Sequence, residues 1–211
     1  MLSRFRHWTP RYVVSRLRYA VFQKTHPDAP WLNQHAVALL ESWLRPQDQG
    51  LEWGSGRSTV WFARRVRRLV SIEHNPVWHE RVKARLQAQK LVNVDCRLVP
   101  VEETAAAGAH PYVQTALSLP PASLDFVLVD GVLRDHCTQA AMALLKPAGL
   151  LILDNAEWYL PHRTFSPKAV GADGHGPTPL WRELAVRLKE WRCVWTSNNV
   201  IDAAFFVKPP S

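Results

Sequence analysis

Residues Leu51–Thr59 of this 211-residue chain have the sequence Leu-Glu-Trp-Gly-Ser-Gly-Arg-Ser-Thr, which is typical of the turn between a strand and a helix in an α/β fold. A short strand over 50–53 precedes its two glycines, and a helix is predicted over 58–67. Glycines between a strand and a helix let the backbone turn sharply and approach a ligand, and the start of the helix offers unpaired N–H groups. Such a turn can also be purely structural. A dinucleotide fingerprint would have a third glycine at position 59, where this chain has Thr59.

Strands and helices alternate along the rest of the chain. Phe126–Val129 is an unbroken apolar run of the kind that is buried on both faces of a sheet. Alternating strands and helices predict an α/β fold with a parallel sheet, whereas the last two strands are close enough in sequence to be antiparallel neighbours. The further predicted strands cover 69–73, 94–99, 124–130, 150–153, 193–196 and 203–208, and the further helices cover 35–44, 76–90, 134–145 and 180–191.

An acidic side chain ends the second strand. Glu73 follows Gly56 by 17 residues, and a carboxylate in that place can accept hydrogen bonds from both hydroxyls of a ribose. The alternative is a solvated glutamate at the end of a strand. Because Glu73 occurs together with the glycine turn, a ribose-binding role is favoured over a solvated glutamate.

These residues resemble the class I S-adenosylmethionine-dependent methyltransferases over about residues 35–208. The motifs are Glu52–Gly56, Ile72–His74, Leu128–Gly131 and Leu151–Asn155, in the family's order and spacing. The resemblance implies a Rossmann-like three-layer sandwich, with a mostly parallel seven-stranded sheet and an antiparallel C-terminal hairpin. It also implies that S-adenosylmethionine is bound by Glu52 (near its amino group), Gly54, Ser55, Gly56, Ser58, Glu73 (at the ribose), His74 and Val101 (bordering the adenine, with the rest of the stretch 99–102) and Asp130.

Three oxygen-bearing side chains follow the fourth and fifth strands. Asp130, Asp154 and Asn155 can converge at the carboxyl edge of the sheet, and such hard ligands suit Mg²⁺ or another divalent cation. The arrangement is similar to the metal site of catechol-type O-methyltransferases, which have a lysine three residues after the first aspartate, where this chain has Leu133. The alternative is that the three side chains contact the cofactor, cap a helix or shape turns.

The helix beginning at Arg134 supplies the other candidate catalytic residues. His136 is suited to act as a general base because an imidazole titrates near neutral pH, although a solvent-facing histidine is an equal alternative. Asp130 and Arg134 are placed beside the acceptor. Among the ten tryptophans, only Trp53 and Trp158 are expected to flank the crevice, and the others on helices are expected to pack on the sheet.

The N-terminal segment 1–30 is basic and amphipathic, and a methyltransferase domain is expected over 31–211. Residues 1–27 hold six Arg and Lys and no acid, within a net charge of +8 for the chain. The segment packs on the domain with its arginines in solvent, or it contacts an anionic membrane surface peripherally through residues 1–25, or it binds an acidic partner. No nucleic-acid partner is expected, because the rest of the chain is nearly balanced in charge and has no recognition motif.

Three dispersed cysteines predict neither disulfides nor a zinc site. No apolar run approaches the length of a membrane span, and the N-terminus lacks the apolar core of a signal peptide, so a cytoplasmic location is expected.

The predicted activity is O-methylation of a small-molecule or glycan-type acceptor. The alternatives are an aminopropyltransferase-like enzyme on the same fold and a non-catalytic protein that binds the cofactor or a membrane.

Overall fold

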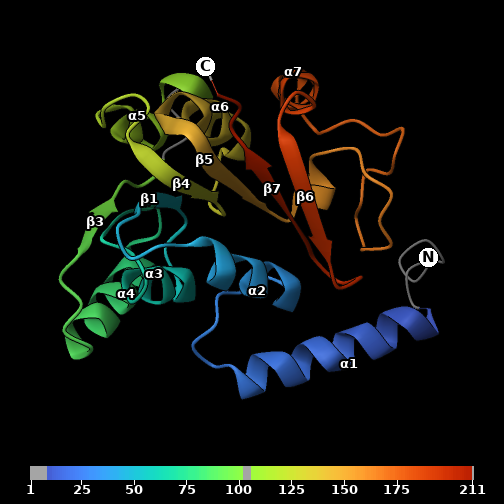
Figure 1. The fold of residues 1–211 in the computed structure, drawn as a ribbon, viewed down its shortest axis with the longest axis horizontal. Coiled ribbons are helices and arrows are strands. Elements are labelled where there is room, and N and C mark those ends of the chain that lie inside the picture. The colour runs from blue at the N-terminus through green and yellow to red at the C-terminus, as the bar shows by residue number, and fades with distance from the viewer. Residues whose placement is uncertain (1–8, 102–105, 211) are drawn as a thin grey trace.

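Seven strands form one mixed sheet in the order β3-β2-β1-β4-β5-β7-β6 (Figure 1). The computed structural model describes residues 9–101 and 106–210. Strands β1 to β5 pair in parallel, and β7 is antiparallel to both β5 and β6. The predicted α/β, Rossmann-like fold with its antiparallel hairpin is confirmed. The strands are β1 (Gln49–Trp53), β2 (Arg68–Glu73), β3 (Val94–Leu98), β4 (Leu124–Val129), β5 (Leu145–Asp154), β6 (Arg192–Ser197) and β7 (Asp202–Val207).

Helices cover both faces of the sheet because both faces of its central strands are apolar. Val127 and Val129 of β4 pack in one core cluster with side chains of α5, α6 and α7, while Phe126 and Leu128 pack in another with α2 and α3. This arrangement is the predicted three-layer sandwich. The helices are α2 (Gln34–Trp43), α3 (Arg57–Ala63), α4 (Pro76–Ala88), α5 (Pro111–Leu117), α6 (Arg134–Leu144) and α7 (Pro179–Leu188), with short 3₁₀ turns at η2 (Ala107–Ala109) and η3 (Ala156–Trp158).

The carboxyl ends of β1 and β4 meet where the strand order reverses. The Gly54 N–H donates to the carbonyl of Ile72 at 2.9 Å, and the Asp130 N–H donates to the carbonyl of Trp53 at 2.9 Å. In a doubly wound sheet this reversal opens the ligand crevice. The fold therefore brings the glycine turn, the end of β2 and Asp130 to one place.

Helix α1 (Pro10–Thr25) lies along the outside of the domain (Figure 1). None of its residues is buried. Among the described residues, no helix is both long and apolar enough to cross a membrane.

Candidate functional site

The turn after β1 passes so close to the backbone after β4 that position 54 requires glycine. Gly54 has a φ of +91°, and a Cβ there would lie 2.8 Å from the carbonyl carbon and oxygen of Asp130. Gly56 has more room, since its nearest neighbour would be an atom of Trp78 at 3.7 Å. The close backbone approach predicted for the turn is therefore found at Gly54 and not at Gly56.

We expect Gly54→Ala to lower the free energy of unfolding by about 2 kcal/mol or more, because a strained φ alone costs about 1–2 kcal/mol and the Asp130 backbone must also move. Gly171→Ala is the matched control, since Gly171 also has a positive φ, +81°, but nothing within 4 Å of its Cβ position. Urea unfolding measures both. Equal losses would show that the contact with Asp130 contributes nothing.

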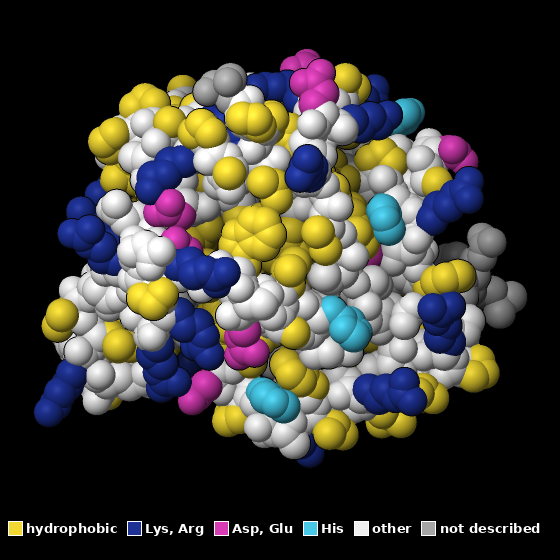
Figure 2. Space-filling view, in the orientation of Figure 1, with side chains coloured by type: hydrophobic (Ala, Val, Ile, Leu, Met, Phe, Trp, Pro, Cys, Tyr) yellow, Lys and Arg dark blue, Asp and Glu magenta, His cyan; other side chains and the backbone are white. Residues whose placement is uncertain are grey.

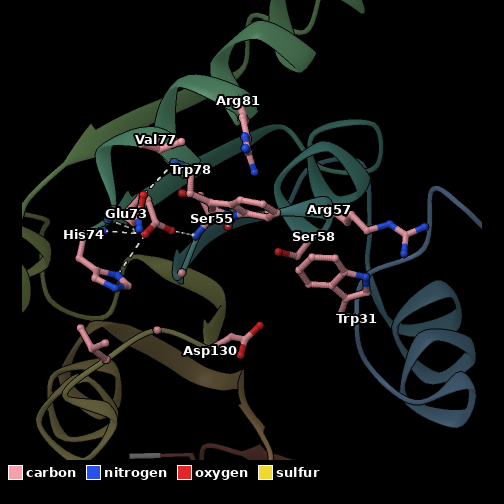
Figure 3. A pocket seen from close by; sticks show the side chains of 15 residues that line it. Trp31, Ser55, Arg57, Ser58, Glu73, His74, Val77, Trp78, Arg81 and Asp130 are labelled. Atoms are coloured by element: carbon pink, nitrogen blue, oxygen red, sulfur yellow. Dashed lines mark hydrogen bonds and ion pairs between the residues drawn. The ribbon is translucent and has the colours of Figure 1, made fainter. Parts of the chain in front are cut away.

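The Glu73 carboxylate is held by the backbone that surrounds it (Figure 3). Its Oε2 accepts from the Ser55 N–H at 2.8 Å, and its Oε1 accepts from the N–H groups of His74 and Asn75 at 2.9 and 2.8 Å. Nδ1 of His74 lies 3.0 Å from Oε1. Glu73 is thus fixed against the glycine turn. Its Oε2 accepts one hydrogen bond, whereas its Oε1 accepts two.

Glu52 lies beneath the turn and does not line the pocket. Its side chain is fully buried and accepts hydrogen bonds from the hydroxyls of Ser58 at 2.7 Å, Ser71 at 2.7 Å and Thr59. Burial raises its pKa to about 7, although the three hydroxyls favour the charged form. Of these three hydroxyl residues only Ser58 lines the pocket, where its hydrogen bond to Glu52 orients it.

The pocket at this crevice has a volume of about 470 Å³. In Figure 3 Asp130 faces Ser55 and Glu73 across it. The residues expected to bind the cofactor line this pocket, apart from Glu52 and Val101: they are Gly54, Ser55, Gly56, Ser58, Glu73, His74 and, from the opposite side, Asp130. The structure thus gathers most of the predicted set around one cavity.

Two tryptophans and two arginines at this pocket were not predicted. Trp31 and Trp78 stack with ring centroids 5.7 Å apart, and the Trp78 indole donates to the carbonyl of Ser55. The guanidinium carbons of Arg57 and Arg81 lie 5.9 and 5.8 Å from the centroids of Trp31 and Trp78. All four line the pocket, which gives it a wall of two stacked aromatic rings with one arginine beside each.

Trp53 lies elsewhere than predicted. It is fully buried in the core, where its indole donates to the carbonyl of Tyr112 at 3.0 Å. Trp158 is not among the residues that line this pocket, and Lys168 stands over its ring at 4.7 Å. The expectation that these two tryptophans flank the crevice is therefore wrong.

Arg134 occupies the centre of the predicted metal triad. Its guanidinium lies 2.8 Å from Asp130 Oδ1 and 4.0 Å from Asp154 Oδ2, and it donates to Asn155 Oδ1 at 3.4 Å. It also donates to the carbonyls of Asp130, Gly131 and Asp154. Among the described residues, no group of three His, Cys, Asp or Glu side chains could hold a metal ion. The structure therefore does not support a divalent cation here, because the cation that the carboxylates share is the arginine.

Burial raises the pKa of both Asp130 and Asp154 above the ordinary value. The pKa of Asp154 rises further because the neighbouring Asp130 charge repels its own, while the Arg134 guanidinium opposes the shift in both. Asp130 thus presents to the pocket a carboxylate that holds a proton more readily than a solvated aspartate does.

Five other predicted residues do not line this pocket: Val101, Arg134, His136, Asp154 and Asn155. The His136 ring packs against Gly108, whose added Cβ would lie 3.1 Å from Nδ1, and His136 does not line the pocket. Val101 is partly exposed and does not line it either. Position 102, predicted with Val101 to border the adenine, lies outside the described residues.

A second buried acidic pair lies beneath the loop 161–178. The Asp202 N–H donates to Glu157 Oε2 at 3.2 Å, and Asp202 itself accepts from the Ser166 hydroxyl and from the Trp195 indole. Burial, with the nearby Asp202 charge, raises the pKa of Glu157 to about 8. Ser166 thereby fastens the long loop to β7.

We expect the stability of the protein to fall as the pH rises from about 4.5 to 8, in part because of Glu157. The folded state holds this proton up to about pH 8 whereas the unfolded state releases it near 4.5, so deprotonation favours unfolding in that window. Glu157→Gln keeps an oxygen for the Asp202 N–H but cannot titrate. Its unfolding free energy should match that of the unmodified protein near pH 4.5 and exceed it at pH 8, as measured by urea unfolding at both pH values. If the two proteins differed in unfolding free energy by the same amount at both pH values, Glu157 would make no contribution to the pH dependence.

Comparisons with solved structures identify the same fold. A methyltransferase from Geobacter sulfurreducens superimposes with a TM-score of 0.56 at 15% identity, over 96% of this chain and 90% of that one. A putative methyltransferase from Streptococcus mutans in complex with SAH gives a TM-score of 0.57 at 11% identity, over 85% and 99%. An rRNA methylase from Streptococcus thermophilus gives 0.53 at 9% identity, over 82% and 93%.

No protein-family model matches the sequence, and no curated protein matches it. At these identities the likeness concerns the fold. The seven-stranded order with its antiparallel hairpin, the glycine turn and the carboxylate after β2 agree with it: this chain has the class I S-adenosylmethionine-dependent methyltransferase fold.

Proposed function

We propose that the protein is an S-adenosylmethionine-dependent methyltransferase that methylates an oxygen of a small-molecule or glycan-type acceptor. The observation that carries the proposal is the Glu73 carboxylate, fixed by three backbone N–H groups beside the Gly54 turn in a pocket of about 470 Å³. A carboxylate at the end of β2 is suited to the hydroxyls of a ribose.

The residues at the crevice fit this cofactor. A Cβ on Gly54 would lie 2.8 Å from the Asp130 backbone, so glycine lets the two strand ends that line the pocket approach each other. Glu73 Oε2 accepts one hydrogen bond within the protein and retains capacity for a hydroxyl. The volume lies in the range of about 300–1,000 Å³ that small-molecule sites occupy.

When bound, S-adenosylmethionine supplies a methyl group on a sulfonium, which needs little activation. The chain's own residues then have to align the acceptor, and orientation alone is worth about 7–11 kcal/mol. Glu73 would hold the ribose, the Ser55–Ser58 turn would hold the methionine end, and Asp130 would face the acceptor. Val101, position 102 and His74 remain our candidates for the adenine.

Asp130 is the group best placed to accept the acceptor's proton. It lines the pocket, and burial raises its pKa, so the carboxylate is a stronger base than a solvated one. Arg134 fixes its orientation through the 2.8 Å contact. His136, packed on Gly108, is retained only as a second candidate.

The mutation Asp130→Asn tests this role. It keeps the shape of the side chain and removes the base, so we expect the rate of methyl transfer to fall by about 100-fold or more. The assay follows labelled methyl transfer from S-adenosylmethionine to pooled small-molecule and glycan acceptors, with ribosomal RNA as a separate arm. An unchanged rate in both Asp130→Asn and His136→Ala would contradict an acid–base role here, and transfer to RNA alone would overturn the acceptor class.

Two cationic groups favour methyl transfer over aminopropyl transfer. Arg57 and Arg81 line the pocket and suit a cofactor that retains its methionine carboxylate. An aminopropyltransferase uses the decarboxylated form, which has no such group. Tighter binding of decarboxylated S-adenosylmethionine than of the intact cofactor would therefore favour the rival enzyme.

A further inference from the structure

Helix α1 has one face bound to the domain and one face turned away from it. The bound face holds Ser15, whose hydroxyl accepts from Asn199 at 3.2 Å, and Gln23, whose amide oxygen accepts from Arg57 at 2.8 Å. Tyr19 lies between them and donates to the carbonyl of Trp31 at 3.4 Å, and Phe22 packs against a core cluster. These contacts fix which side of the helix faces outward.

The outward face is a stripe of four aliphatic side chains, Val13, Val14, Leu17 and Val21, which we call the outer stripe. Their exposed fractions are 39%, 47%, 63% and 61%. At 3.6 residues per turn they lie together on one side of the helix, opposite Ser15 and Tyr19. A contiguous exposed aliphatic stripe marks an interaction surface.

Basic side chains border the outer stripe on both sides. Arg16 lies about 100° from Leu17 on one side and Arg18 about 100° on the other, with Arg11 beyond it. The described part of the chain ahead of Asp28 contains no acidic residue, and Asp28 is itself paired with Arg64. Figure 2 shows hydrophobic and basic side chains next to each other along the lower edge of the molecule, over α1. An aliphatic centre with cationic borders is the pattern of a helix that lies in the plane of an anionic lipid surface.

An exposed aromatic side chain adjoins one of these borders. Phe165 of the loop 161–178 is 70% exposed, and the Arg11 guanidinium carbon lies 4.2 Å from the centroid of its ring. Lys168 lines the same shallow cavity between the loop and the start of α1. The loop thus extends the surface with one more apolar group and one more cation.

We infer that α1 docks through the outer stripe on an anionic membrane surface. The charge argues against a second copy of this chain as the occupant, since pairing two such helices would bring Arg16 and Arg18 against the same cations with no acid between them. Lipid headgroups supply the missing negative charge, at about 1 kcal/mol for each basic residue near the surface. This inference does not depend on the proposed methyl transfer.

Docking would also place the lipid surface beside the candidate active site. The face of α1 opposite the outer stripe reaches that site, because Gln23 holds Arg57, which lines the pocket. Tyr19 lies within electrostatic reach of Asp154 and Asp130, and burial, aided by these charges, raises its pKa well above the ordinary value. Helix α1 thus lies between the outer stripe and Arg57, which lines the pocket.

Sedimentation of the full chain with vesicles tests the inference. We expect binding to equimolar phosphatidylcholine and phosphatidylglycerol, little binding to phosphatidylcholine alone, and loss of binding at high salt. Leu17→Ser with Val21→Ser should lower the partition coefficient at least about tenfold. Arg16→Gln and Arg18→Gln should each lower it about fivefold without altering the stripe.

The matched control is Val92→Ser with Val186→Ser, since these valines are 94% and 66% exposed on other parts of the surface. This variant should bind as the unmodified protein does, and thermal melting checks that all variants remain folded. Equal binding of neutral and anionic vesicles, binding that the stripe variant retains, or no binding at all would overturn the inference. So would a dimer in solution that the stripe variant abolishes, because it would assign the surface to a second copy.

Discussion

We expect Glu73→Ala to weaken the binding of S-adenosylmethionine at least about 100-fold. The side chain is 3% exposed, and we propose that its Oε2 binds a ribose hydroxyl, a hydrogen bond to a charged group being worth about 1.5–3 kcal/mol. Alanine also leaves the N–H groups of Ser55, His74 and Asn75 without their acceptor, which loosens the glycine turn. Calorimetric titration of the purified variant measures the change in dissociation constant.

Glu80→Ala is the matched control because Glu80 is an exposed glutamate on α4, paired with Lys83 at 3.3 Å and outside the pocket. Glu73→Gln is informative as well, since its amide oxygen still accepts from a backbone N–H while the negative charge is lost. We expect its affinity to fall between those of the other two. A folded Glu73→Ala variant that binds as tightly as Glu80→Ala would remove Glu73 from the cofactor site.

The mutation Arg134→Met should destabilise the protein by about 3–5 kcal/mol, the usual cost of removing one partner of a buried ion pair. The Arg134 side chain is 13% exposed and stands between Asp130 and Asp154, so its loss leaves two carboxylates facing each other. Their pKa values, already raised by burial, should rise further without the guanidinium. The loss of stability should therefore be smaller at acid pH, where both carboxylates are protonated in either state.

Arg97→Met provides the comparison for urea unfolding. Arg97 also pairs with an aspartate, Asp95, at 2.8 Å, but at a more exposed position where such a pair is worth about 1 kcal/mol or less. A loss in Arg134→Met no larger than that in Arg97→Met would contradict the view that the arginine holds the two strand ends together.

The fold could be predicted from the sequence because the strands are marked by local patterns. The apolar run of β4 and the Pro76 that opens α4 each identify an element without knowledge of its neighbours. Helix α5 is not predicted, although Pro111 stands at its first position. Its seven residues are too few for the hydrophobic periodicity of a helix to be recognised. Helix α3 ends at Ala63 and not near Arg67, because the chain turns there to enter β2.

The site could be predicted only in part, since side-chain direction depends on tertiary contacts. Position along the strand was enough to find Glu73 and Asp130. It could not show that the hydroxyls of α3 and β2 enclose Glu52, nor that the Trp78 ring reaches the carbonyl of Ser55. Arg134 is the clearest case. Asp130 and Asp154, at the ends of two strands, do share a cation, but it is the guanidinium of Arg134 on α6 and not a metal ion.

Calorimetric titration of the unmodified full chain with S-adenosylmethionine, and with its demethylated product, shows whether the crevice binds this cofactor. We expect each ligand to bind once per chain and the two to compete, because both present the same ribose to Glu73. A well-folded protein that binds neither ligand would contradict this expectation.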